Sequence, residues 1–384
     1  MEQGKRKKAG DTVKKDSRKK RQVSRTKGEE AMKQNEDKMI LTAAAMSDAQ
    51  KAHSAAVEEI LPEQPRANVV GLGVGVKWRK GVPTGEPALV VLVTQKLEEE
   101  QLNPDDLVPP ELAGMQTDVL AVGYPVAGGT ETLAVAPQTL AQRMRPAEGG
   151  YSVGHVNITA GTIATCVYDI LPGGTVSPPA HGIGIPSKYY ILSNNHVLAN
   201  VNAASVSDPI LQPGPFDGGT DPTDRIATLS RFIPITLFPP VLPPLHNNII
   251  DAAIAEGQFH DLDREVYWIG YVQGWARKEN VTVGMKVKKT GRTTNFTTGR
   301  ITAVNATIDV GYGGGRVARF KDQIVTTNIS AGGDSGSLVL SLDNVAVGLL
   351  FAGSSIATIL NQIENVRSLL RVEVAERILI PSVG

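Results

Sequence analysis

A tight glycine turn with a central serine joins two apolar runs in the string ISAGGDSGSLVLSLDNVAVGLL, residues 329–350. Gly332 and Gly333 have no Cβ and tolerate positive φ, so the main chain can turn sharply there. The N–H groups of Gly333 and Ser335 can then converge on one point and hold an oxyanion. A serine hydroxyl becomes a nucleophile only beside a base. The turn therefore predicts a nucleophilic Ser335 if a base and an orienting acid exist upstream; the alternative is an ordinary glycine-rich β-turn.

His196 is the candidate base, because it follows a short β-prone run in KYYILSNNHVLAN. The other five histidines have less suitable settings: a helical segment, glycine-rich connections, a position after a proline pair and one after the strand that should carry the acid. They are His53, His155, His181, His246 and His260.

Asp251 is the candidate acid, since it lies inside the apolar run IIDAAIA. A carboxylate in such a run is costly unless it is hydrogen-bonded, and a histidine would supply that bond. Four other aspartates lie in a Pro/Gly-rich loop, where solvated turn positions are expected: Asp208, Asp217, Asp221 and Asp224.

The order His, Asp, Ser is that of chymotrypsin, and NNHVL, DAAIA and GGDSGSLV resemble the three triad blocks of chymotrypsin-like serine peptidases. The chain is most similar to the disulfide-free intracellular trypsin-like peptidases of bacteria and to the plant Narrow leaf protease group, from about Ala67 onward. The resemblance implies that His196 is the general base, that Asp251 orients it and that Ser335 attacks. It also implies an oxyanion hole from the amides of Gly333 and Ser335.

Two positions depart from the pattern of that family. Ser337 replaces the second glycine of GDSGG, and Phe351 stands where digestive relatives have a serine that helps to hold the triad acid. The resemblance places Ile329 at the base of the primary substrate pocket and Phe351, Ala352 and Gly353 along one wall. An isoleucine cannot pair with a basic side chain, so we expect cleavage after small or medium apolar residues.

The fold expected is mainly β: two six-stranded-type antiparallel β-barrels of the chymotrypsin-like fold, preceded by a small α+β module and a disordered basic tail. The 39 Gly and 24 Pro suit many short strands joined by turns. The expected divisions are a tail at 1–38, an amphipathic helix at 39–66 beginning near Ser47, the module at 67–123, a linker or wrapping segment at 124–156, barrel 1 at 157–260, barrel 2 at 261–354, and a C-terminal helix and tail at 355–384.

Cys166 is the single cysteine, so the fold must stand without an internal disulfide, and a cytoplasmic location is expected. The sequence has no apolar run of 18 or more residues, so no membrane partner is expected. No metal-binding constellation or phosphate-binding loop is evident, so no cofactor is expected.

Residues 1–38 hold 14 Lys/Arg against 7 Asp/Glu, which leaves a net charge of −7 on the rest of the neutral chain. Such a segment has too few apolar residues to repay the entropy of ordering. A solubilising tail is the favoured interpretation. A contact with nucleic acid or another acidic partner is the alternative.

These features predict a serine endopeptidase that acts on protein substrates through an acyl-enzyme. The alternatives are an idle protease fold used as a peptide-binding or assembly module, and a nucleic-acid-associated protein acting through its tail. We further expect conditional activity. In the secreted relatives, the aspartate before the nucleophile is paired by a new N-terminus that cleavage liberates. The resemblance therefore implies that Asp334 needs an ordering contact, from a side chain, from the module, or from a neighbouring subunit in a homo-oligomer. A permanently ordered loop is the alternative.

Overall fold

The computed structural model describes residues 33–61, 63, 68–102, 104, 107–128, 139–158, 160–169 and 188–374. Most of the expected tail at 1–38, the last ten residues of the C-terminal tail and His181 lie outside these ranges. Within them, no helix has the length and apolarity needed to cross a bilayer.

The first β-sheet body is an open sheet of eight strands in the order β23-β9-β10-β13-β12-β11-β7-β8. Its strands are β7 (Ser152–His155), β8 (Gly161–Thr162), β9 (Cys166–Asp169), β10 (Tyr189–Ser193), β11 (Pro209–Leu211), β12 (Arg225–Phe232), β13 (Ala253–Gly257) and β23 (Val372–Glu373). The expected start of barrel 1 at residue 157 is too late. Strand β7 lies in the segment 124–156, for which a linker or a wrapping segment was expected, and it pairs with both β8 and β11.

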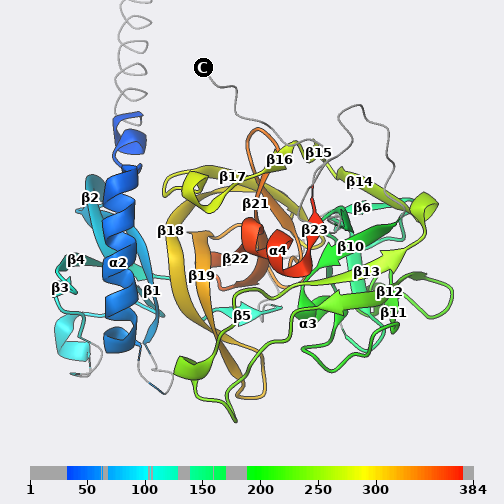
Figure 1. Ribbon diagram of the computed structural model, residues 1–384, viewed down its shortest axis with the longest axis horizontal. Coiled ribbons are helices and arrows are strands. Elements are labelled where there is room, and N and C mark those ends of the chain that lie inside the picture. The colour runs from blue at the N-terminus through cyan, green and yellow to red at the C-terminus, as the bar shows by residue number, and fades with distance from the viewer. Residues whose placement is uncertain are drawn as a thin grey trace, which may run out of the picture.

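The second body contains a closed ring of six strands in the order β17-β20-β21-β22-β19-β18, closed by the pairing of β17 with β18. Its strands are β17 (Lys286–Gly291), β18 (Asn295–Gly311), β19 (Val317–Thr327), β20 (Leu338–Ser341), β21 (Val345–Gly353) and β22 (Ala357–Gln362). Two short strands, β5 (Val126–Ala127) and β16 (Gly274–Trp275), pair with β21 beside the ring. The expectation of a mainly β, two-body architecture is confirmed, with the first body open rather than closed (Figure 1).

A third, small sheet joins β6 (Ala147–Gly149), β14 (Leu262–Val266) and β15 (Gly270–Tyr271). Single-turn 3-10 segments connect the larger elements. They are η1 (Glu99–Gln101), η3 (Pro215–Asp217), η4 (Pro243–Leu245), η5 (Phe259–Asp261) and η6 (Lys278–Asn280).

The N-terminal module continues the sheet of the second body. Its strands are β1 (Val69–Arg79), β2 (Val82–Val93), β3 (Glu111–Leu112) and β4 (Met115–Ala121), and β1 pairs antiparallel with β18. The glycines of GLGVGV allow this close approach, because a Cβ at Gly71 would lie 2.7 Å from the carbonyl oxygen of Thr307. A Cβ at Gly73 would lie 3.2 Å from the Cβ of Ala303, which also lies on β18. The module and the second barrel therefore share one sheet.

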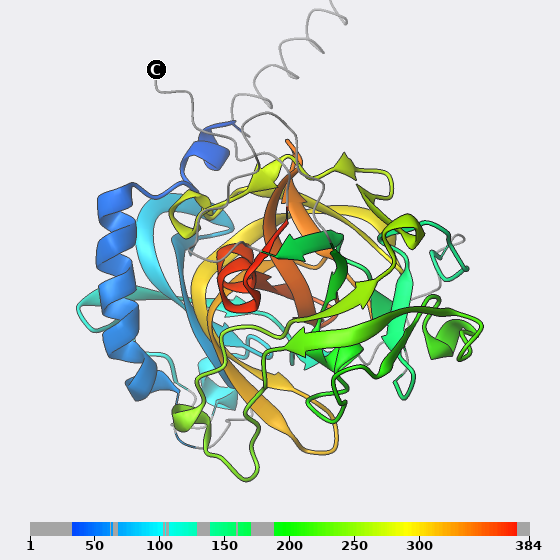
Figure 2. The ribbon, with the colours of Figure 1, turned by 45° about the vertical axis from the view of Figure 1, so that its right-hand side comes forward.

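Helix α2 (Ala43–Ile60) covers the module's sheet on the side away from the barrels (Figures 1 and 2). It begins at the N-cap Thr42, whose hydroxyl accepts a hydrogen bond from the N–H of Ala45, so the expected start near Ser47 is wrong. Its buried face packs on β1 and β2. His53 lies on this face, with Nε2 3.0 Å from the carbonyl oxygen of Leu72. Burial lowers the pKa of His53, as expected for a core histidine.

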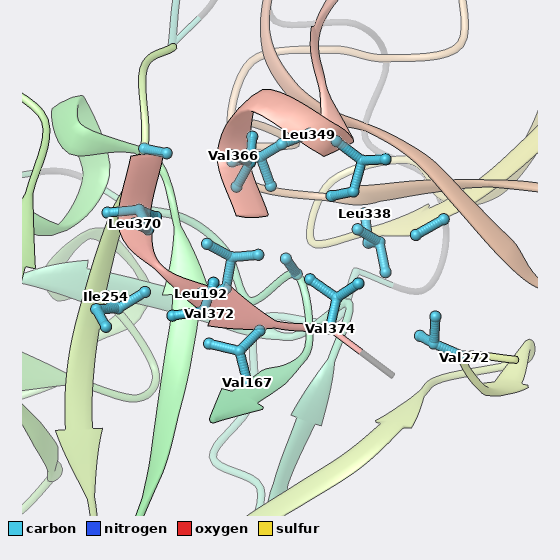
Figure 3. Packing of buried hydrophobic residues seen from close by; sticks show 14 of the residues in the cluster. Val167, Leu192, Ile254, Val272, Leu338, Leu349, Val366, Leu370, Val372 and Val374 are labelled. Carbon is cyan, nitrogen blue, oxygen red and sulfur yellow. The ribbon is translucent and has the colours of Figure 1, made fainter. Parts of the chain in front are cut away.

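The expected C-terminal helix from Ile356 is wrong in its first part. Residues Ala357–Gln362 form β22, a strand buried between β19 and β21, and only Ile363–Leu370 form a helix, α4. Helix α4 and the residues after it pack against both bodies (Figure 3). The contacting residues are Val366, Leu370, Val372 and Val374 on this segment, Leu192 and Ile254 on the first body, and Leu338 and Leu349 on the second. The end of the described chain thus helps to hold the two bodies together.

Candidate active site

His196 lies in the single-turn helix α3 (Asn195–Leu198), which begins where strand β10 of the first body ends. Side-chain hydrogen bonds fix this corner. Ser193 Oγ donates to the carbonyl oxygen of Thr162 at 2.7 Å, and Asn195 Nδ2 donates to that of Ile233 at 2.7 Å. The SNN sequence therefore stops the strand and sets the position of the histidine.

Asp251 lies beside this histidine just before β13, and its side chain is completely buried. Its Oδ2 is 2.6 Å from His196 Nδ1, and its Oδ1 accepts the main-chain N–H of His196 at 3.1 Å. Because Nδ1 is the donor in this contact, Nε2 is left as the acceptor on the far side of the ring. The structure brings together the two residues that the sequence nominated as base and acid.

Tyr312, which the sequence analysis did not consider, completes the shell of Asp251. Its hydroxyl donates to Asp251 Oδ2 at 2.7 Å, and its ring stands edge-on to the imidazole of His196. Burial, with the nearby Asp251 carboxylate, raises the pKa of Tyr312 well above its ordinary value, so the phenol stays a donor. The main-chain N–H of Asp251 donates to Asn361 Oδ1 at 3.0 Å. Phe351 therefore does not leave the acid loosely held, because these groups do the work of the missing serine.

Ser335 lies at the turn between Ile329 and β20 of the second body, and its carbonyl oxygen accepts the N–H of Thr162 of the first body at 2.7 Å. It is 5% exposed, and its Oγ lies 3.4 Å from the carbonyl oxygen of Phe351. The buried His196 Nε2 has no hydrogen-bond partner among the described residues. The structure therefore shows a histidine Nε2 without a partner in the described chain and a serine hydroxyl that is only weakly engaged.

The two amides proposed for the oxyanion hole are oriented by bonds to the carbonyls that precede them. Thr293 Oγ1 donates to the oxygen of Gly332 at 2.7 Å, which directs the N–H of Gly333 the opposite way across the planar peptide. Ser337 donates two hydrogen bonds to the carbonyl oxygen of Asp334, one from its Oγ at 2.6 Å and one from its N–H at 3.0 Å. These bonds direct the N–H of Ser335 the opposite way across its own peptide. Within the described ranges neither amide has a hydrogen-bond acceptor. Ser337 is thus a second clamp on this loop.

Gly333 adopts a φ of +93°, which L residues with side chains rarely take. A Cβ there would lie 2.6 Å from Thr293 Oγ1. Glycine is therefore required at this position for both conformation and space.

The guanidinium of Arg292 lies near Gly333, and Arg292 Nε donates to Asp217 Oδ2 at 2.7 Å. The side chain of Asp217 is only 6% exposed, so the expectation that it is a solvated turn aspartate is wrong.

Asp334 receives its ordering contact from within the chain. Lys289 of β17, which is fully buried, places Nζ 3.1 Å from Asp334 Oδ2. Thr293 and Thr294 donate their main-chain N–H groups to the other oxygen at 2.8 and 3.1 Å. Burial lowers the pKa of Lys289 and the Asp334 carboxylate opposes that shift. Of the sources considered from the sequence, a side chain supplies this contact.

A pocket opens beside Ser335, and it draws on both the second barrel and the segment that follows the module. Its lining residues are Gly123, Tyr124, Val126, Asn328, Ser330, Ala331, Gly332, Ser335, Leu350, Ala352, Gly353, Ser354 and Ser355. Ala352 and Gly353, which the resemblance places along a wall of the substrate pocket, are among these lining residues. Ile329 and Phe351 are not among these residues: Ile329 packs in a core cluster with Val287 and Val339, and Phe351 packs on Phe320. Both assignments are therefore wrong. The side chains of Ile329 and Phe351 point into the core, whereas their neighbours in the chain line the pocket.

Comparison with known proteins gives two local matches in sequence. The family model of the NARROW LEAF 1 N-terminal domain matches residues 56–124, which span the end of α2 and strands β1 to β4. Glutamyl endopeptidase 2 of Streptomyces griseus is 42% identical over 86 residues, which is 22% of this chain and 42% of that protein. The chain therefore spans less than half the length of this curated relative.

Among solved structures, Thermobifida fusca Protease A is 17% identical, with a TM-score of 0.39 over 59% of this chain and 96% of that one. A glutamic acid specific serine protease is 21% identical, with a TM-score of 0.39 over 59% of this chain and 99% of that one. The structure has two β-sheet bodies, with His196 and Asp251 on the first and Ser335 on the second, and one stretch of sequence is similar to a glutamyl endopeptidase. The chain thus has a mainly β architecture of two sheet bodies, and its residues 56–124 resemble the NARROW LEAF 1 N-terminal domain.

Proposed function

We propose that this protein is a serine endopeptidase. His196 Nε2 takes the proton of Ser335 Oγ as the oxygen attacks a peptide carbonyl, and Asp251 stabilises the imidazolium that forms. The N–H groups of Gly333 and Ser335 stabilise the oxyanion. The leaving amine takes its proton from His196, and water then hydrolyses the acyl-serine through the same base.

The observation that supports this proposal is the preorganised state of the groups around Ser335. The histidine is held in the tautomer that leaves Nε2 as an acceptor, because Nδ1 lies 2.6 Å from Asp251 Oδ2. The two oxyanion amides are held by the clamps of Thr293 and Ser337. An idle protease fold would have no need to retain all of these contacts, so this alternative is the weaker one.

The pocket supports a preference for small or medium uncharged residues before the cleaved bond. Its lining residues carry no Asp, Glu, Lys, Arg or His. Two of its hydroxyls are already engaged: Ser330 Oγ with Thr358 Oγ1 at 2.7 Å, and Ser354 Oγ with the carbonyl oxygen of Val122. A charged side chain would therefore lack a partner there. The name of the Streptomyces relative raises cleavage after glutamate as the competing specificity.

A cytoplasmic location remains our proposal, based on the single, buried Cys166. A contact of residues 1–38 with nucleic acid remains the second candidate for the tail. Loss of salt-dependent nucleic-acid binding on removal of those residues would support it.

The test is hydrolysis of a fluorogenic peptide library by the wild-type protein and by Ser335→Ala and His196→Ala. Both variants should lose turnover to background, because members of a triad act as a unit. The library should favour small and medium apolar residues before the cleaved bond. Unchanged turnover in either variant would refute the triad, and a profile dominated by Glu, Arg or Lys would refute the specificity.

A further inference from the structure

Strand β5 (Val126–Ala127) of the chain itself lies against the end of β21 that adjoins the candidate triad. It pairs antiparallel there, with Val126 opposite Gly353 and Ala127 opposite Ala352. On its other side β5 meets the end of β18, where the N–H of Gly311 donates to the oxygen of Pro125 at 2.9 Å. At this point β22 takes the other edge of β21, so β5 takes the edge that is left.

This segment continues toward the reacting groups. A Cβ at Gly128 would lie 3.9 Å from Cδ2 and 4.0 Å from Nε2 of His196. Tyr124 and Val126, just before it, line the same pocket as Ser335. The main chain from Tyr124 to Gly128 thus passes along the pocket and ends beside the unpartnered Nε2.

Extended peptides commonly bind proteins by adding a strand to a free sheet edge, where main-chain hydrogen bonds supply affinity and pockets select side chains. The edge of β21 at Ala352–Gly353 is next to the nucleophile, so a peptide paired there would be delivered to Ser335. In the proposed peptidase the substrate would pair with this edge, and we propose that residues Tyr124–Gly128 are its built-in occupant, which a substrate must displace. This inference rests on the proposed peptidase function.

The occupant is held weakly enough to be exchanged. Strand β5 has two residues, both only partly buried. Tyr124 is 44% exposed, and its ring edge contacts the main chain at Gly311, where a Cβ would lie 2.9 Å from Tyr124 Cε1. Such a short strand contributes few hydrogen bonds of its own, so an extended peptide can compete for the same edge. The free protein should therefore hydrolyse peptides slowly until β5 is released.

The occupant also indicates the class of ligand. Pro125, Val126 and Ala127 are small, uncharged residues, which matches the uncharged lining of the pocket, and the chain turns at Gly128, where φ is +80°. We expect good substrates to be extended peptides with small apolar residues before the cleaved bond, and a peptide of residues 122–128 to act as a competitor.

A disulfide between β5 and β21 tests the proposal. Ala127 and Ala352 lie directly opposite each other, and residues so paired have Cα atoms about 4.5–5.5 Å apart, within the range a disulfide spans. The double variant Ala127→Cys/Ala352→Cys should form this bond readily. The native Cys166 is buried, so it should not compete with the two new cysteines. The oxidised protein should hydrolyse peptides at least tenfold more slowly than the same protein after reduction. Ala127→Cys alone, under the same oxidant, is the control and should show no such difference.

Equal hydrolysis by the oxidised and reduced double variant would overturn the proposal, as would failure of the two cysteines to join. Failure of the proposed function looks different: Ser335 would then resist diisopropyl fluorophosphate in the wild-type protein and in both redox forms alike.

A second variant loosens β5 instead of locking it. Tyr124→Ala removes the ring at Gly311 and should raise the rate of labelling by the fluorophosphonate about tenfold. The synthetic peptide of residues 122–128 should slow labelling of this variant, whereas a scrambled peptide of equal composition should not. An unchanged labelling rate together with no effect of the peptide would contradict the proposal.

Discussion

At the scale of single residues, Lys289 shows how a side chain of the same chain orders the loop that carries Ser335. A fully buried ammonium faces a fully buried carboxylate, with Nζ 3.1 Å from Asp334 Oδ2. Removing one partner of such a pair leaves an uncompensated buried charge, which costs roughly 3–5 kcal/mol. The pair therefore links the stability of the second barrel to the shape of the loop that carries Ser335.

We predict that Lys289→Met lowers the free energy of unfolding by about 3 kcal/mol or more and abolishes peptide hydrolysis. Lys289→Met/Asp334→Asn should recover most of the stability, because the unpaired charge is gone. Denaturant titration followed by fluorescence measures both. Lys288→Met is the matched control, since Lys288 is only partly buried and its Nζ donates to the carbonyl oxygen of Leu342. A stable and active Lys289→Met protein would refute this role.

Tyr312 has a different role, that of a positioning residue for Asp251. Tyr312→Phe removes the 2.7 Å hydrogen bond to Oδ2 and keeps the ring. A hydrogen bond to a charged group contributes about 1.5–3 kcal/mol, so kcat should fall roughly 10- to 100-fold while KM stays nearly constant. Tyr190→Phe is the control, because the Tyr190 hydroxyl bonds Asp169 on the first sheet, away from Ser335. An unchanged kcat in Tyr312→Phe would show that Asp251 is held without it.

The sequence allowed His196, Asp251 and Ser335 to be nominated because each lies in a short local pattern of strand, turn and apolar flank. Tyr312 and Lys289 could not be found in this way. Their partners lie 61 and 45 residues away in the chain, and nothing in VGYGGGR or KVKKTG marks either side chain as buried. Three lysines in KVKK look alike until the register of β17 turns Lys289 inward.

At the scale of elements, the third sheet places acidic side chains close together. Glu148 of β6 is partly buried, and burial together with Asp263 and Glu265 of β14 raises its pKa to about 6. A carboxyl group whose pKa is higher in the folded state than in the unfolded state favours folding in its protonated form. That contribution is present below the unfolded value of 4.5 and is lost as the pH rises through about 6.

Glu148→Gln should therefore be more stable than the wild-type protein at pH 7.5, by roughly 2 °C in melting temperature, and nearly equal to it at pH 4. Glu58→Gln, at an exposed position of α2, is the control and should show no such pH dependence. Thermal unfolding followed by circular dichroism at both pH values measures this. A Glu148→Gln protein that is less stable at pH 7.5 would contradict the assignment.

The C-terminal segment shows where elements could not be read from sequence. Apolar residues at 359, 360 and 363 fit a helix, but they fit equally a strand that is buried on both faces. Strand β22 is of the second kind, with all six residues buried between β19 and β21. Only its neighbours in the barrel decide between the two forms, and those neighbours are distant in the chain.

At the scale of the whole molecule, the module and the second barrel form one sheet through β1 and β18. The alternating glycines of GLGVGV suggested a glycine-faced strand but did not reveal what it faces. Because β1 covers an edge of β18 that would otherwise be open, the module should unfold together with the barrel.

We predict that Gly71→Ala lowers the melting temperature of the module and of the second barrel together, in one transition. The new Cβ would lie 2.7 Å from a main-chain oxygen of β18, which cannot move without distorting that strand. Overpacking of this kind costs about 1–3 kcal/mol. Scanning calorimetry provides the measurement. Two separate transitions, with only the first one shifted, would show that the module folds independently.

The central claim is that Ser335 is a nucleophile activated by His196 and Asp251. The most direct measurement is mass spectrometry of the intact protein, followed by peptide mapping, after exposure to diisopropyl fluorophosphate. The account predicts one adduct, located on Ser335, that is absent in Ser335→Ala and strongly reduced in His196→Ala. An unmodified Ser335 in the wild-type protein, or equal labelling in His196→Ala, would contradict it.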